Sequence, residues 1–369
     1  MNNKTGKETE CCWINAFKGI AICAVVMVHN VGSGVPDKID SIVAMGQYGV
    51  QMFFLISSYL TYVSLDKICI NASRKIEFRR LLQWWKKKFF HLIPMYYLAL
   101  VIYMICIGGM PYWLGTEGKV TVLNFVSHLF FVHGFVPHYV DSILGVEWYL
   151  GNLAIMYILM PLFYRMINNI EKSIGIFLGS LVLCKFVNSY AMNHWIPDVW
   201  DSYIYSNYFG NYFFIQQLPV ILLGIVLYFF LQSKWLSETK SNKILSYELM
   251  IVSGLMLLGE MYDKNTMVLM STYVRYAIWF CVLIISQSIY ANRIINNRLF
   301  QKLGKQSYGV YLFHYLIIWI IEKYFIIDGE NLMKWGIKYM IVLGISSLIS
   351  VLWERVIKEI SMKMDKIIL

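Results

Sequence analysis

Two ionisable residues, Lys18 and His29, lie in the first apolar run of the chain. Eleven positions separate them, which is about three helical turns, so a helix would place both side chains on one face about 16 Å apart along its axis. An ionisable residue inside a membrane-spanning segment is a functional candidate by default. An imidazole suits proton transfer near neutral pH. In a purely structural alternative, the Lys18 side chain snorkels to the cytoplasmic interface and His29 is an interfacial imidazole.

The composition indicates an integral membrane protein. Of 369 residues, 58% are hydrophobic and only 15% are charged, whereas a soluble domain carries charges on about 25% of its residues. The 27 Tyr and 12 Trp suit helix ends in the headgroup region. The N-terminus shows no pattern of a removable signal peptide, so we expect the first apolar run to stay as a helix. The 7 Cys have no metal-ligand spacing.

The pattern of apolar runs predicts an all-α, polytopic membrane protein with about ten transmembrane helices plus a re-entrant or interfacial segment. We expect a cytoplasmic segment at 1–13, a transmembrane domain at 14–356 and a cytoplasmic tail at 357–369. The predicted helices are Ile14–Val31, Ser41–Leu65, Phe89–Ile107, Val146–Tyr164, Ser173–Tyr190, Tyr212–Leu231, Ile244–Tyr262, Met267–Tyr290, Ser307–Ile327 and Trp335–Trp353.

The distribution of Lys and Arg sets the expected orientation. With both termini cytoplasmic, the inner segments hold 23 Lys and Arg and the outer segments hold 4, as the positive-inside rule requires. Eight of the 23 lie in 66–88, which we interpret as a basic loop. The run 122–136 is too short to cross and is interrupted by His128 and His133, so we expect it to be re-entrant or interfacial on the outer side.

Five stretches together resemble the acyltransferase-3 family of integral membrane acyltransferases. The spacing from Lys18 to His29 is similar to the family's Arg-x10-His, and later stretches follow in the family's order. Departures are Lys18 for Arg, Ser58 for Gly, and Lys88 and His91 for two Arg. The later stretches are Gly49-Val50-Gln51-Met52-Phe53-Phe54-Leu55-Ile56-Ser57-Ser58-Tyr59-Leu60, Lys88-Phe89-Phe90-His91-Leu92-Ile93-Pro94, Trp148-Tyr149-Leu150 with Tyr157 and Pro161, and Ser307-Tyr308-Gly309-Val310-Tyr311-Leu312-Phe313-His314.

The resemblance implies transfer of an acetyl group from cytoplasmic acetyl-CoA to a hydroxyl of an extracytoplasmic or lipid-linked saccharide. His29 would be the general base, with direct transfer and an acyl-His intermediate both open. Lys18 would orient His29 or contact the donor. Basic side chains would hold the CoA phosphates, although their position in a cytoplasmic loop is also explained by topology alone. The main candidates are Lys88, His91, Arg79 and Arg80, and the same basic loop also offers Arg74, Lys75, Lys86 and Lys87.

Further candidates follow from the same resemblance and from the spans. Donors to the oxyanion or contacts to the acceptor are Ser57, Trp148, Tyr157 and Asn30. Secondary candidates are Arg275, Tyr308, Tyr311 and His314; Arg275 would contact an anionic acceptor or pair with an acid such as Glu260 or Asp263, and His314 would bond Tyr311 or Ser307.

The expected partners are the bilayer, a saccharide acceptor and an acyl-CoA donor, with no nucleic acid, no metal and no tightly bound cofactor beyond acetyl-CoA as co-substrate. The expected location is the inner or plasma membrane. Two other readings stay open at this point: a transporter or exporter with the same number of helices, and a transferase for succinyl or longer acyl groups. A transporter would need no acyl donor, which separates the two classes.

Overall fold

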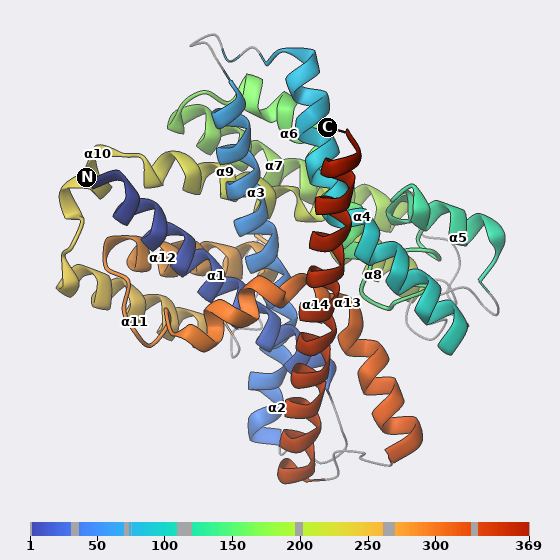
Figure 1. Cartoon of the computed structure of the whole chain (residues 1–369). Helices are drawn as coiled ribbons and strands as arrows, with labels where there is room; N and C mark the ends of the chain where they lie inside the picture. Colours follow the sequence, from blue (N-terminus) through green and yellow to red (C-terminus); the bar gives the residue numbers. More distant parts are fainter. Residues whose placement is uncertain are drawn as a thin grey trace. The chain divides into compact units, whose positions relative to one another are not determined.

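The structure is a computed structural model that describes residues 2–30, 37–69, 74, 76–108, 120–195, 202–260, 270–325 and 331–368 (Figure 1). All regular secondary structure in these ranges is helical. The chain divides into two compact units, one formed by Met1–Gly49 with Arg293–Leu369 and the other by Val50–Asn292. The first and last parts of the sequence therefore fold together.

The first unit is built on α1 (Asn2–His29), which packs along α13 (Arg298–Phe325). The last helix, α14 (Leu332–Ile368), packs on α13 as well. Figure 1 shows these three helices with α2 (Asp37–Ala44), which leads through the short 3₁₀ turn η1 (Met45–Tyr48) into α3 (Gly49–Ile68). The pairing of α1 with α13 joins segments almost 300 residues apart in the sequence.

Glycines bring the backbones of α1 and α13 into direct contact. A Cβ on Gly304 would lie 1.7 Å from the carbonyl oxygen of Asn15, and a Cβ on Gly19 would lie 2.0 Å from that of Phe300. Small residues at helix contacts are the usual means of close packing in membranes, where apolar burial does not drive association. These two glycines therefore set the position of α1 against α13.

Gly304→Ala is expected to lower the thermal unfolding midpoint, because the added methyl group has only backbone to displace. Forcing a methyl group into such a contact costs about 1–3 kcal/mol. The control is Gly179→Ala in α7 (Ile170–Tyr190), where a Cβ would meet nothing within 4 Å. That change should leave the midpoint unchanged or raise it slightly. A Gly304→Ala protein as stable as the wild type would refute this account of the packing.

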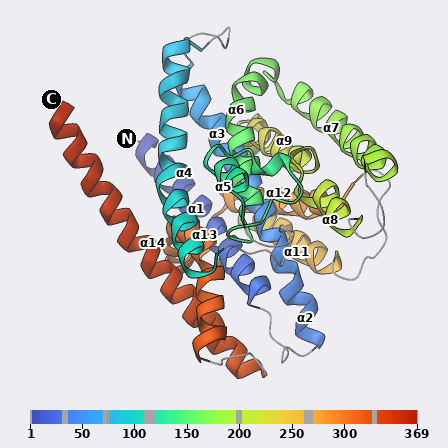
Figure 2. The ribbon, with the colours of Figure 1, turned by 90° about the vertical axis from the view of Figure 1, so that its right-hand side faces the viewer.

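The second unit contains most of the remaining helices (Figures 1 and 2). The α7 helix packs on α9, and α11 packs on α12. The elements are α3 (Gly49–Ile68, its first residue in the first unit), α4 (Phe78–Cys106), α5 (Val122–Leu129), η2 (His133–Phe135), α6 (Trp148–Met166), α7 (Ile170–Tyr190), η3 (Ala191–Trp195), α8 (Ser202–Asn207), η4 (Tyr208–Tyr212), α9 (Phe214–Leu231), α10 (Lys234–Thr239), α11 (Lys243–Gly259) and α12 (Thr272–Ile289).

A proline inside α6 helps to join it to α4. Pro161 has no N–H, so the carbonyl of Tyr157, four residues earlier, loses its helical partner. The indole Nε1 of Trp85 on α4 donates to that carbonyl at 2.9 Å. The proline motif of the sequence therefore frees an acceptor that an aromatic residue of a neighbouring helix uses.

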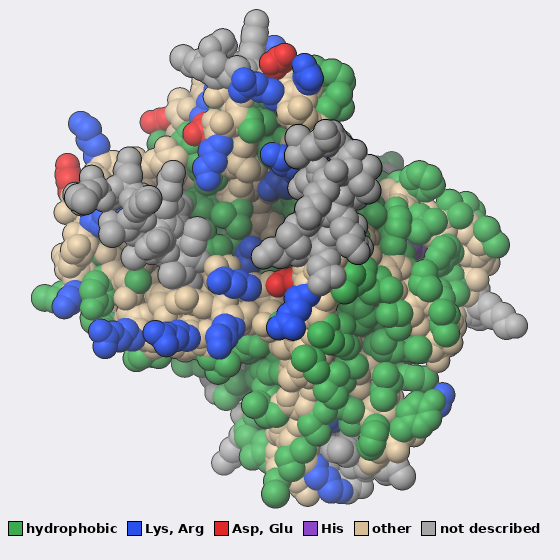
Figure 3. Space-filling model, in the orientation of Figure 1, with side chains coloured by type: hydrophobic (Ala, Val, Ile, Leu, Met, Phe, Trp, Pro, Cys, Tyr) green, Lys and Arg blue, Asp and Glu red, His purple; other side chains and the backbone are tan. Residues whose placement is uncertain are grey.

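The helices agree with the predicted membrane fold. Each of the ten predicted spans overlaps a helix, and five described segments are long and apolar enough to cross a membrane: Ile39–Ile68, Phe78–Cys106, Tyr205–Leu231, Thr272–Ile289 and Leu332–Val356. Figure 3 shows hydrophobic side chains covering α5 and α14, where Val122 and Met340 are exposed. The α5 helix has only eight residues and does not cross, as predicted for 122–136.

Three boundaries differ from the sequence prediction. The basic segment 66–88 is not a loop throughout, because α4 begins at Phe78. Residues 78–88 contain no Gly or Pro and are rich in Arg, Lys, Leu and Gln, which favour helix. At the ends of the chain, α1 starts at Asn2 and α14 runs to Ile368, so helices continue through both predicted terminal segments.

Candidate active site

His29, the last residue of α1, lies against His314 of α13 in the first unit. Nδ1 of His29 is 2.9 Å from Nε2 of His314, and the two rings stack with centroids 5.1 Å apart. The ring of Tyr315 lies on His29 at 4.7 Å. His314 is fully buried, whereas His29 is only partly buried. The pair thus has a buried partner and a more accessible imidazole.

Backbone carbonyls fix the proton positions of this pair. Nδ1 of His314 lies 2.7 Å from the carbonyl oxygen of Tyr311 and 3.1 Å from that of Val310. Because a carbonyl only accepts, Nδ1 of His314 carries the proton, and Nε2 of the neutral ring is an acceptor. Nδ1 of His29 must then donate to it. The remaining nitrogen of His29, Nε2, is left with a lone pair, which is the form that a general base needs.

The other predicted residues of α13 lie before His314 on the same helix. Tyr311 is buried with its ring 6.0 Å from that of His314, and Tyr308 is partly buried one turn earlier. Ser307 donates to the carbonyl of Gly304 within the helix. His314 therefore bonds Tyr311 through its carbonyl, not Ser307, and its second partner, His29, was not predicted.

Lys18 and Asn30 occupy different places around His29. Lys18 is partly buried on the same helix, eleven residues before His29, and the helical rise makes this about 16 Å along the axis. Asn30 is fully buried, and its Nδ2 donates to the carbonyl of Trp335 at 3.1 Å, while its Oδ1 has no partner among the described residues. One hydrogen of the Asn30 amide is therefore committed to holding α14.

Ser57 and Trp148 belong to the second unit. Ser57 Oγ lies 3.3 Å from the hydroxyl oxygen of Tyr149. Trp148 packs on Phe54 and Tyr212, with ring centroids 5.8 and 5.0 Å apart. The structure thus groups two hydroxyls and an indole near the start of α6.

The predicted CoA contacts are not gathered in one place. The ammonium of Lys88 lies over the rings of Trp84 and Tyr157, 5.4 and 5.3 Å from their centroids. Arg79 and Arg80 are exposed in the first turn of α4, more than two turns before Lys88, and Arg80 pairs with Glu77 at 3.5 Å. His91, one turn after Lys88 on α4, is also exposed. Tyr157, which the sequence suggested as an oxyanion or acceptor contact, therefore has its ring against the ammonium of Lys88.

The histidines before α6 form a buried structural network around Glu147. The Glu147 carboxylate accepts from the backbone N–H groups of Ile143, Leu144 and Val146 at 2.7–3.1 Å, and from His128 Nε2 at 3.2 Å. His133 stacks on His128 with centroids 4.2 Å apart and contacts the Glu147 carbonyl. All three side chains are fully buried, so this network holds the loop rather than an exposed acceptor site.

Asp141 completes this network at the start of α6. Its Oδ1 accepts from the backbone N–H of Trp148 at 2.9 Å, and its Oδ2 has no partner among the described residues. Burial raises the pKa of the Asp141 carboxyl, and the neighbouring Glu147 carboxylate raises it further. Burial therefore favours the neutral form of the Asp141 carboxyl, which still accepts from the N–H of Trp148 at the start of α6.

Arg275 forms a closed ion pair on α12. Its Nε donates to Glu260 Oε2 at 2.6 Å, and Trp279 donates to the other carboxylate oxygen at 3.3 Å. Of the two acids predicted as partners, Glu260 is the one that pairs, and Asp263 lies outside the described residues. A satisfied pair of this kind favours a structural role over an anionic substrate contact.

Two features of the site escaped sequence reasoning. Tyr315 directly follows the last residue of the late motif, and its contact with His29 becomes visible only when α1 and α13 are paired. The role of Glu147 as the centre of a backbone-donor network depends on the turn at 141–147, which no hydrophobic period predicts.

Comparison with known proteins identifies the fold family. The family model described as an acyltransferase domain matches residues 13–353. The O-acetyltransferase OatA of Staphylococcus aureus strain NCTC 8325 / PS 47 and that of strain COL are each 25% identical to the chain over 305 residues, covering 76% of this chain. The chain spans about half, 47%, of the length of these relatives. No solved structure matches the chain.

The match covers the whole region that carries the five motifs, from the first helix through α14. It includes His29 and His314, the two residues that the structure joins, and the spans that make the chain an all-α membrane protein. The chain is a member of the acyltransferase-3 family of membrane acyltransferases.

Proposed function

We propose that the chain is a membrane O-acetyltransferase that moves an acetyl group from acetyl-CoA on the cytoplasmic side to a hydroxyl of an extracytoplasmic or lipid-linked saccharide. The relatives named O-acetyltransferase support the acetyl group and the oxygen acceptor. The family match favours a transferase over an exporter. The excess of Lys and Arg in 66–88 and near both termini supports the plasma membrane with both termini inside.

The observation that carries the chemistry is the hydrogen bond between Nδ1 of His29 and Nε2 of His314. It leaves Nε2 of His29, the less buried residue of the pair, as a proton acceptor. In the proposed reaction, that nitrogen takes the proton of the acceptor hydroxyl while the oxygen attacks the thioester carbonyl. The carbon–sulfur bond then breaks, and the sulfur of CoA leaves with the proton that His29 returns.

His314 acts in this scheme as a positioning residue. Its ring is oriented by two backbone carbonyls. By accepting the hydrogen bond from Nδ1 of His29, it fixes the tautomer and the orientation of the His29 ring. Lys18 lies on the same face of α1 and is proposed to contact acetyl-CoA, because its ammonium group would attract the anionic donor.

Acetyl-CoA is expected to raise the thermal unfolding midpoint of the detergent-purified protein. A ligand at 100 times its Kd stabilises the folded state by about 2.7 kcal/mol. His29→Gln should keep this stabilisation, because the proposed role of His29 is proton transfer rather than donor binding. Sodium acetate at the same concentration is the control and should give no shift. A protein that no acyl-CoA stabilises would contradict the proposed donor and favour an exporter.

A further inference from the structure

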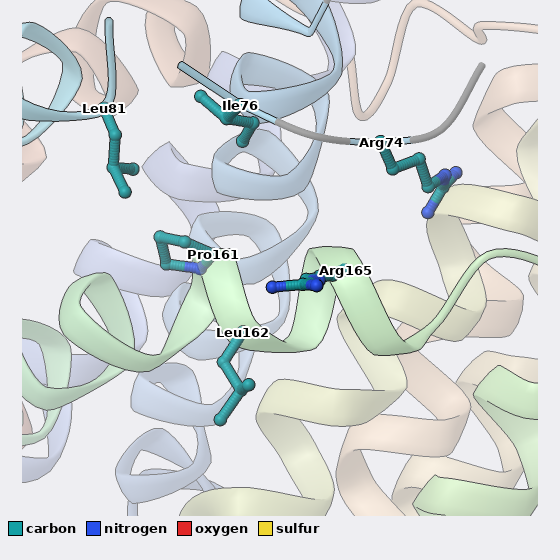
Figure 4. Close-up of a pocket in the computed structure, with 6 residues that line it drawn as sticks. All are labelled: Arg74, Ile76, Leu81, Pro161, Leu162 and Arg165. Carbon is teal, nitrogen blue, oxygen red and sulfur yellow. The ribbon is translucent and has the colours of Figure 1, made fainter. Parts of the chain in front are cut away.

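A pocket of about 420 Å³ lies in the second unit between the segment that enters α4 and the end of α6 (Figure 4). Its walls combine two arginines, Arg74 and Arg165, with four apolar side chains. In Figure 4, Arg165 rises from α6, whereas Arg74 belongs to the segment before α4. The apolar wall consists of Ile76, Leu81, Pro161 and Leu162. Arg74, one of the basic residues of 66–88 expected to face the CoA phosphates, lines this pocket, whereas Lys88, His91, Arg79 and Arg80 do not.

Arg74 is held rigidly at one end of the pocket. Its Nη1 donates to the hydroxyl of Tyr62 at 2.7 Å and to the carbonyls of Tyr164 and Ile167 at the end of α6. Its guanidinium lies over the ring of Tyr164, 4.6 Å from the centroid. Its backbone is left-handed, with φ of 53°, a conformation that the surrounding structure must hold in place.

The hydrogen bonds of Arg74 to described residues all use Nη1, one of its three nitrogens. Nε and Nη2 make no hydrogen bond to any residue that the structure describes. These two nitrogens form the edge that binds a phosphate or carboxylate with two parallel hydrogen bonds. The nearby acid, Asp66, accepts from the Tyr164 hydroxyl at 2.8 Å and makes no ion pair with Arg74. A fixed guanidinium with an open bidentate edge is therefore available at this wall.

Arg165 supplies a second cation to the same space. It is exposed in the last turn of α6, four residues after Pro161, and it forms no ion pair with a described acid. A basic residue at the end of a helix also stabilises the helix dipole, and this alone would explain Arg165 on an ordinary surface. Here it shares a concave pocket with Arg74.

We propose that this pocket binds the nucleotide half of CoA, with its phosphates on Arg74 and Arg165 and its adenine against the apolar wall. The assignment rests on the proposed function, in which acetyl-CoA arrives from the side where 66–88 and Arg165 lie. A volume of 420 Å³ is near the lower end of the roughly 300–1,000 Å³ of small-molecule pockets, which suits a nucleotide without the pantetheine arm.

The phosphate of a lipid headgroup could bind the same arginines, but it carries less negative charge than the nucleotide half of CoA. A phosphodiester headgroup carries one negative charge, whereas the nucleotide of CoA carries a diphosphate and a phosphate monoester. Two guanidinium groups beside an apolar wall match the second ligand better. The earlier candidates Arg79 and Arg80 lie on open helix surface with no such wall.

The test is the Kd of the purified full chain for CoA and for adenosine 3′,5′-bisphosphate, measured by titration calorimetry. Arg165→Gln is expected to raise both Kd values at least tenfold. Lys172→Gln is the matched control, because Lys172 is an exposed cation near the start of the next helix and lies outside the pocket. It should change either Kd less than twofold. Thermal unfolding of each variant checks that it is folded.

The outcomes separate this site from the proposed function. If the wild type and Arg165→Gln bind CoA equally, the pocket is not the nucleotide site, although the donor assignment survives. If Arg165→Gln instead loses only co-purified phosphatidylglycerol, the pocket is a lipid site and the proposal is overturned. If the wild type binds no CoA, both the pocket assignment and the proposed donor fall.

Discussion

His29→Gln is expected to lower kcat for acetyl transfer by about 10²–10⁴-fold, the usual contribution of a general base. The glutamine amide keeps much of the size of the imidazole but cannot take a proton from a hydroxyl near neutral pH. KM for acetyl-CoA should stay close to the wild-type value, because the proposed binding groups lie elsewhere. The measurement is the rate of CoA thiol release by purified protein supplied with acetyl-CoA and an envelope extract from the organism that encodes the chain.

His314→Phe separates positioning from catalysis in the same assay. Phenylalanine keeps the ring that stacks on His29 but removes the acceptor for His29 Nδ1. Loss of such an orienting partner typically costs 10–100-fold, so kcat should fall by about that factor with a changed pH profile. If His314→Phe has the wild-type rate and pH profile, then the imidazole pair does not set the tautomer of His29.

Glu147→Gln is expected to cause the largest loss of stability. The carboxylate accepts from three backbone N–H groups and from His128 in a fully buried site. An amide keeps one acceptor oxygen and turns two hydrogens toward N–H donors. Breaking one side of a buried charged network costs about 3–5 kcal/mol. The thermal unfolding midpoint of the detergent-purified protein should therefore fall by several degrees or more.

The control for Glu147 is Glu171→Gln. Glu171 is an exposed acid in the first turn of α7, and its loss removes only a small dipole interaction of about 0.3–1 kcal/mol. If the Glu147→Gln and Glu171→Gln proteins have the same thermal unfolding midpoint, the network around Glu147 does not contribute the predicted stability.

Hydropathy predicts the membrane helices well because the bilayer requires long apolar segments whose backbone is bonded internally. Each predicted span overlaps a helix, and the short run around His128 is correctly not a span. The start of α4 at Phe78 could not be predicted from the apolar run, since a helix rich in Lys and Arg continues beyond the membrane without any hydrophobic signal.

The candidate site was predictable in its residues but not in its contacts. The spacing of Lys18 and His29 and the late motif ending at His314 name two helices that the structure pairs, α1 and α13. Their contact depends on Gly19 and Gly304, which let α1 and α13 approach backbone to backbone. Arg165 gave no sequence signal, because a basic residue at a helix end is ordinary, and only the pocket beside Pro161 makes it a candidate.

The most direct test of the central claim is base-labile acetate in the cell envelope of the organism that encodes the chain. The chromosomal copy is deleted and then restored as wild type or as His29→Gln, with equal amounts of protein in the membrane. The account predicts that deletion lowers the acetate released by mild alkali, that the wild type restores it, and that His29→Gln does not. Full restoration by His29→Gln would contradict the proposed catalytic base.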